Sequence, residues 1–171
     1  MRKIKNKEKF LEKLLTPAEP GSEHGLLARL EGDWRVTGTW AFPPTDITTQ
    51  VDTVMQNRLI MGGLFLEFTT AFEDGLIGSR AFFGYDPHER CYVGFSFSCL
   101  TPRIDTEKGA YDRQADSLAL EGVEPFGDTG KTLRFRREFN FIASDKLGLR
   151  ILYPDAPPER RVAMDLTAER V

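Results

Sequence analysis

Along most of this chain, apolar and polar residues alternate in short runs separated by glycine, proline and aspartate. In the first run every second residue is apolar or small, at Trp34, Val36, Gly38, Trp40 and Phe42. A period of two is typical of a β-strand with one buried face. The pattern predicts ten strands, near residues 33–42, 48–57, 63–72, 76–86, 90–99, 103–111, 117–123, 131–142, 147–153 and 161–170.

The connections between these runs are short, as at Glu73-Asp74-Gly75, and no helical pattern of ten or more residues interrupts them. Short connections favour antiparallel neighbours over parallel strands joined by helices. We therefore predict an all-β fold, a single up-and-down antiparallel barrel of about ten strands.

Two helices are expected before the barrel. A short floor helix covers residues 26–30, and an amphipathic helix covers the first 15 residues, with Phe10, Leu11, Leu14 and Leu15 at helical spacing. Prolines and a glycine follow the first helix, so we divide the chain into a helix and linker at 1–20 and a barrel at 21–171. The helix either lies on the barrel or in solvent, or it docks on a membrane surface or a partner.

Trp34 and Arg170 stand at opposite ends of the strand series, on matching faces. If the first and last strands pair, the Arg170 guanidinium stacks on the Trp34 indole and seals the closure of the barrel. Gly32-x-Trp34 with a late arginine resembles the floor of the lipocalins (calycins), and this resemblance implies a lipocalin-like barrel.

Four further segments resemble, in order, an uncharacterised bacterial family known only as a domain of unknown function. They are His24 to Trp34, Gly62 to Leu66, Gly84-Tyr85-Asp86 with Tyr92-Val93-Gly94, and Met164 to Arg170. The resemblance implies a fold and no activity. At the positions of Ser96 and Ser98 the family carries tryptophan and aspartate, and at the position of Ala168 it carries tyrosine. Because this chain has smaller side chains there, we expect a roomier barrel interior.

Charge and cysteine usage narrow the function classes. A net charge of −3 offers no large positive field for nucleic acid, although residues 1–15 hold six basic and two acidic side chains. We expect no secretory signal and no membrane span. Cys91 and Cys99 lie on one predicted strand, roughly 26 Å apart, and cannot bridge each other. With no Cys/His cluster, we expect a cytoplasmic protein without structural metal.

Arg137 is the most informative candidate inside the barrel. It shares a face with Leu133, Phe135, Phe139 and Phe141. A charge among apolar side chains needs a partner, water or an anionic ligand. Arg137 either binds a ligand's carboxylate, or it reaches the barrel mouth or pairs with a carboxylate such as Glu67. In the first case, replacing Arg137 with methionine is expected to leave stability equal or higher.

The strand at 90–99 has two faces, and either could be interior. One carries Tyr92, Gly94, Ser96 and Ser98, the other Cys91, Val93, Phe95, Phe97 and Cys99. We favour the first, which would offer hydroxyls to a ligand. The candidate ligand-binding residues are Trp40, Phe68, Tyr92, Ser96, Ser98, Phe135, Arg137 and Phe139.

Catalytic and cofactor motifs are missing from the sequence. It has no Gly-x-Ser-x-Gly, no phosphate-binding glycine loop and no His-Glu-x-x-His, and the carboxylates of Asp145 and Asp155 fall in loops. His24 precedes the floor helix and His88 sits in a turn, so neither is placed to ligate haem. We expect no catalytic residue, cofactor or metal.

Three functions remain open. The barrel binds a small hydrophobic or amphipathic molecule, with a carboxylate as one option for its polar group. Alternatively, a barrel filled by its own side chains serves as a protein-interaction or homodimerisation module. A cofactor-free barrel enzyme is the third, with no motif in its favour.

Overall fold

The computed structural model describes residues 2–41, 47–71, 77–99, 101–125 and 131–171. Within these ranges the chain forms two α-helices, two short 3₁₀ turns and ten strands. The helices are α1 (Arg2–Leu15) and α2 (His24–Leu30), and the 3₁₀ turns are Met61–Gly63 and Pro158–Arg160. The strands are β1 (Gly32–Ala41), β2 (Thr48–Ile60), β3 (Phe65–Ala71), β4 (Ile77–Asp86), β5 (Cys91–Ser98), β6 (Thr101–Asp112), β7 (Ser117–Pro125), β8 (Thr132–Ala143), β9 (Lys146–Leu152) and β10 (Val162–Arg170).

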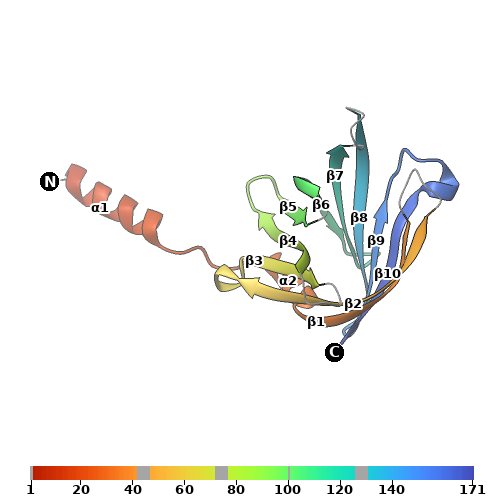
Figure 1. Cartoon of the computed structure of the whole chain (residues 1–171). Helices are drawn as coiled ribbons and strands as arrows, with labels where there is room; N and C mark the ends of the chain where they lie inside the picture. The colour runs from red at the N-terminus through yellow and green to blue at the C-terminus, as the bar shows by residue number, and fades with distance from the viewer. Residues whose placement is uncertain (1, 42–46, 72–76, 100, 126–130) are drawn as a thin grey trace.

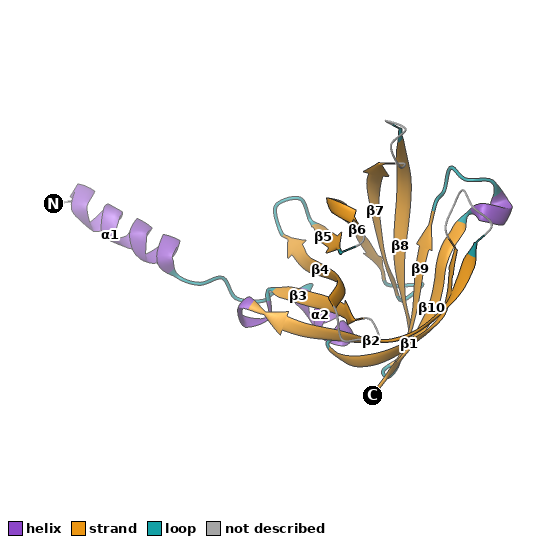
Figure 2. Ribbon diagram, viewed as in Figure 1, coloured by secondary structure: helices purple, strands orange, loops and turns teal. Residues whose placement is uncertain are grey.

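The ten strands close into one antiparallel barrel in which each pairs with its neighbours in sequence and β1 pairs with β10 (Figures 1 and 2). The closing register places Trp34 opposite Arg170 and Trp40 opposite Met164. The predicted all-β, up-and-down barrel is confirmed.

The predicted strand bounds differ most around the β2–β3 turn. β2 continues three residues beyond the predicted end at 57, because Arg58, Leu59 and Ile60 pair with Glu67, Leu66 and Phe65 of β3. The predicted start of the next strand at 63 falls in the 3₁₀ turn, where Gly62 has a φ of +70° that suits glycine. Predicted strand residues 42, 72 and 76 lie outside the described residues.

Helix α2 lies across one end of the barrel and forms its floor. Its Leu26, Leu27 and Leu30 are buried against the strands. The Leu30 carbonyl accepts hydrogen bonds from Trp34 Nε1 at 3.0 Å and from Asn57 Nδ2 at 2.8 Å. These two bonds satisfy a carbonyl at the helix end that has no partner within the helix.

Arg170 completes the floor. Its guanidinium carbon lies 4.4 Å from the Trp34 ring centroid, so the stacking predicted from the sequence is present. The same guanidinium donates to the carbonyls of Glu31 at 2.5 Å and Arg29 at 3.3 Å. Gly32, with a φ of +126°, leaves the space that Arg170 occupies, since a Cβ there would collide with Nη1. The barrel closure is thus also a cap on the last turn of α2.

The interior has two levels. Near the floor the inward side chains are almost fully buried, among them Trp34, Leu66, Phe83, Leu118, Phe139, Leu147 and Ala168. Toward the opposite end the inward residues are half-buried, among them Trp40, Val51, Thr70, Ser96, Ser98 and Ile151. The lower level is therefore a packed core, and solvent reaches the upper level. Ala168 belongs to the lower level, so its small side chain does not enlarge the upper one.

Helix α1 projects away from the barrel on the side where β3, β4 and β5 lie (Figure 1). Its residues 7–15 are all exposed. No described helix has the length and apolar character needed to cross a membrane.

Candidate functional site

The candidate site is centred on a buried ion pair between β8 and β6. Arg137 Nε donates to Glu107 Oε2 at 3.0 Å and lies 2.9 Å from Oε1. The Glu107 side chain is 1% exposed and that of Arg137 is 13% exposed. The guanidinium carbon also lies 5.9 Å from the Phe83 ring centroid. Arg137 does face inward, but the partner suggested from the sequence was wrong: Glu67 instead pairs with Arg80, at 3.3 Å.

Two glycines make room for this pair. Gly94 on β5 and Gly122 on β7 are the cross-strand neighbours of Glu107. A Cβ at Gly94 would lie 2.8 Å from the Phe83 ring and 3.1 Å from Glu107 Cγ, and one at Gly122 would lie 2.5 Å from the Phe135 ring. Side chains at either position would displace the ion pair or the rings beside it.

Some polar atoms of the pair are unused. Both Glu107 oxygens share one N–H, and Oε1 is buried without a well-formed hydrogen bond. Among the described residues, the hydrogen bonding of Arg137 uses Nε alone. The Arg137 side chain keeps 13% exposure and its Nη atoms are not fully buried, so these donors are open to water or to a bound molecule.

A second polar network lies above the pair, and sequence analysis missed it. Arg103 on β6 donates to Asp105 at 3.0 Å and to Glu124 on β7 at 2.8 Å. The Tyr153 hydroxyl donates to the other oxygen of Glu124, which links the end of β9 to β7. Burial and the adjacent Glu124 carboxylate raise the pKa of Tyr153, so the phenol stays protonated.

The alternation of Arg103, Asp105 and Glu107 with outward residues could have revealed this interior stripe. The alternation on β6 did not predict the buried face, because inward positions 103, 105 and 107 are charged whereas the apolar Ile104 faces outward and is 67% exposed. For this reason the sequence indicates Arg137 as a charge on an apolar wall, whereas Glu107, Asp105 and Arg103 also lie in the interior.

The structure divides the predicted ligand-binding residues between the two levels. Trp40, Ser96 and Ser98 face the upper interior, and Phe135 and Arg137 lie below them. Phe68 and Phe139 belong to the packed core, where they make edge-to-face contacts with Phe83 and with each other. Tyr92 also lies in the lower level, and its hydroxyl donates to the Glu23 carbonyl at 2.9 Å. Burial raises the pKa of Tyr92 to about 12.

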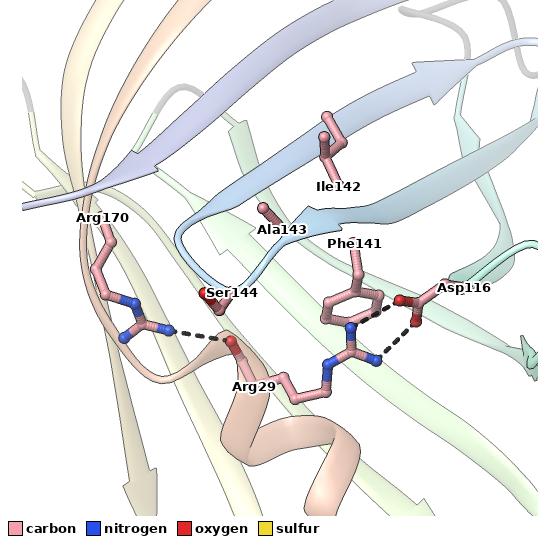
Figure 3. A pocket seen from close by; sticks show the side chains of 7 residues that line it. All are labelled: Arg29, Asp116, Phe141, Ile142, Ala143, Ser144 and Arg170. Carbon is pink, nitrogen blue, oxygen red and sulfur yellow. Dashed lines mark hydrogen bonds and ion pairs between the residues drawn. The ribbon is translucent and has the colours of Figure 1, made fainter.

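A hollow on the underside of the floor contains two further arginines (Figure 3). The Arg29 guanidinium stacks 4.0 Å from the Phe141 ring centroid and makes two hydrogen bonds to Asp116, at 2.7 and 2.9 Å. The hydrogen bonds from Arg29 and Tyr111 lower the pKa of Asp116 to about 2. Arg170 binds the carbonyls of α2. Both cations are therefore engaged by the protein.

The remaining sequence candidates lie apart from the interior. His24 begins α2, where its Nδ1 accepts from the Gly21 amide at 2.9 Å, and His88 is exposed in the β4–β5 turn. Asp155 pairs with Arg134 on the outer wall, and Asp145 is exposed in the β8–β9 turn. Within the described ranges, no three His, Cys, Asp or Glu side chains gather as a metal site.

The fold and the site define a closed ten-stranded antiparallel barrel with a helical floor, a packed lower core and a charged upper interior. Residues 19–167 match the family described as "Protein of unknown function (DUF1579)", and the chain belongs to this family. No curated protein matches the sequence.

Proposed function

We propose that the upper interior of the barrel binds a small amphipathic molecule. The observation that carries the proposal is the Glu107–Arg137 pair, in which one carboxylate holds Nε and leaves the Nη donors of a buried guanidinium without a protein partner among the described residues. The Nη atoms are not fully buried, so they are open to water in the free protein, and the polar group of a ligand would take the place of that water. The polar group of the ligand would accept hydrogen bonds from Arg137.

The apolar part of the ligand would lie among the half-buried residues of the upper level. Trp40, Val51, Leu133 and Ile151 offer apolar contact there, and Ser96 and Ser98 offer hydroxyls. A mostly apolar wall with a few fixed polar groups is typical of small-molecule sites.

Free thiols at Cys91 and Cys99 support a reducing compartment such as the cytoplasm for this activity.

Pairing with Glu107 reduces the preference for an acidic ligand that an unpaired Arg137 would give. Because Glu107 offsets the charge of Arg137, and Asp105 and Glu124 outnumber the nearby Arg103, the upper interior holds no excess of positive charge. A carboxylate therefore gains less than it would beside an isolated arginine. We expect an acid and its neutral ester to bind with affinities within about tenfold of each other.

The test is a calorimetric titration with 4-phenylbutanoic acid and its methyl ester as probes. Removing both members of the pair, in Glu107→Met with Arg137→Met, deletes the donors without leaving a buried charge. We expect affinity for both probes to fall by about tenfold or more, the scale of a charge-assisted hydrogen bond. Arg136→Met is the matched control, because Arg136 lies on the outer face of β8 and pairs with Glu138 and Glu121.

Unchanged affinity in the double variant would reject the proposed role of the pair. Absence of binding of either probe by the wild-type protein would favour the alternative function, a barrel that acts through its outer surface. The observation in favour of that alternative is a group of stacked aromatic rings on the outer face, half-buried Phe82 of β4 with exposed Phe95 and Phe97 of β5.

A further inference from the structure

The outer wall carries an apolar patch on three adjacent strands, formed by Phe82 of β4, Phe95 and Phe97 of β5, and Ile104 of β6. The Phe82 ring stacks with those of Phe95 and Phe97, at centroid distances of 5.0 and 6.4 Å. Phe95, Phe97 and Ile104 are 43%, 40% and 67% exposed. Elsewhere the outer wall carries many charged pairs, such as Arg35–Asp52 and Arg134–Asp155. A contiguous exposed aromatic surface of this kind marks an interaction site.

Helix α1 presents a second apolar surface without a partner in the structure. Phe10, Leu11, Leu14 and Leu15 lie on one side of the helix and are 51–77% exposed. Its polar side carries Lys9, Glu12 and Lys13. A 14-residue helix with this composition is marginally stable alone in water, so it needs a surface against which to bury its leucines.

The connection between the two surfaces is short. The Pro20 ring lies against the turn before β3, since a Cβ at Gly63 would be 3.3 Å from Pro20 Cγ. Phe65 follows two residues later, and its ring covers Gly84, the neighbour of Phe82 on the outer face of β4. The five residues from Thr16 to Pro20 span up to roughly 16 Å when extended. Neighbouring strands lie about 4.8 Å apart, so a linker of this length is long enough to carry Leu15 from the β3 side of the barrel to the patch on β4, β5 and β6.

Charge favours the same contact. Residues 1–15 hold six basic and two acidic side chains, whereas the rest of the chain holds 17 basic and 24 acidic. The helix and the barrel therefore attract each other at low ionic strength. We propose that α1 folds back and docks its Phe10–Leu15 side on the Phe82/Phe95/Phe97/Ile104 patch of its own barrel.

Amide hydrogen exchange on the full-length protein tests this docking. In the wild type we expect the amides of residues 10–15 to exchange about tenfold or more slowly than in Phe95→Ser with Phe97→Ser. The matched control is Val54→Ser with Ile142→Ser, which removes two exposed apolar side chains from β2 and β8 and should leave α1 protection unchanged. Protection of the barrel amides verifies folding in each variant.

A second variant changes only the helix. Leu11→Ala with Leu14→Ala keeps or raises helix propensity and removes the docking side chains. Docking predicts that α1 exchanges faster in this variant, whereas a free helix would exchange at the same rate or more slowly.

Four results would overturn the proposal. The first is rapid exchange of the α1 amides in the wild type, and the second is protection of these amides that survives in the Phe95/Phe97 variant. The third is protection that decreases when the protein is diluted, with a dimer detected by sedimentation, and the fourth is protection that appears only when vesicles containing phosphatidylserine are added. The third result would assign the patch to a second copy, and the fourth would assign the helix to a membrane surface.

Discussion

At the residue scale, the Glu107 carboxylate decides how Arg137 behaves. An arginine alone on an apolar wall would be a strong anion site, and its removal would relieve a buried charge. Glu107 lies 2.9 Å from Nε and is 1% exposed, so each charge now compensates the other. Breaking a buried pair on one side is costly, whereas removing both charges is often neutral.

This pair reverses the expectation that Arg137→Met would be at least as stable as the wild type. The single variant leaves Glu107 buried without a counter-charge, and we expect the free energy of unfolding to fall by about 3–5 kcal/mol. The double variant, Glu107→Met with Arg137→Met, should have a free energy of unfolding within about 1 kcal/mol of the wild-type value. Urea denaturation followed by circular dichroism gives the free energy of unfolding of all three proteins. Equal stability of the single variant and the wild type would show that the pair contributes nothing.

At the element scale, the meeting of β1, β10 and α2 holds the barrel closed. Trp34 and Asn57 bind one carbonyl of the last helical turn, and Arg170 binds two others while it covers the indole. A residue at the end of the last strand thus fixes the helix that precedes the first strand. The Arg170 contacts join residues 139 and 141 positions apart in the chain, so they stabilise the protein only when the whole sheet has closed.

Arg170→Met tests this closure. Loss of the cation–π contact and of the hydrogen bonds to Glu31 and Arg29 should lower stability by about 1–3 kcal/mol. For a chain of this size that corresponds to a fall in melting temperature of roughly 2–12 °C. Arg35→Met is the control, since its exposed pair with Asp52 contributes little. Equal melting temperatures for the two variants would contradict the closing role of Arg170.

The strands themselves were predictable from the sequence, because apolar side chains recur at every second residue of a strand with one buried face. The same signal failed where charged residues face inward and an apolar residue, Ile104, faces outward. On β6 the inward residues include Arg103, Asp105 and Glu107, so the alternation did not show which face was buried. On β5 both faces are suitable for an interior, and the Phe95 and Phe97 rings lie outside. Partners such as Glu107 and Arg137, 30 residues apart, required the register of the strands between them.

At the scale of the whole molecule, the barrel is filled from the floor upward. Rings and leucines pack the lower level, the Glu107–Arg137 pair lies above them, and the half-buried upper level is open to solvent. The chain's two tryptophans fall on different levels. Trp34 is 0% exposed at the floor, and Trp40 is half-buried in the upper interior.

These two indoles allow the most direct test of ligand binding in the upper interior. 4-Phenylbutanoic acid is titrated while tryptophan emission is recorded in the wild type and in Trp40→Phe, and calorimetry verifies binding to both. We predict an emission change in the wild type that is absent in Trp40→Phe, because the remaining Trp34 lies beneath the packed core. An emission change of equal size in Trp40→Phe, or no binding of the acid by the wild type, would contradict a ligand site in the upper barrel.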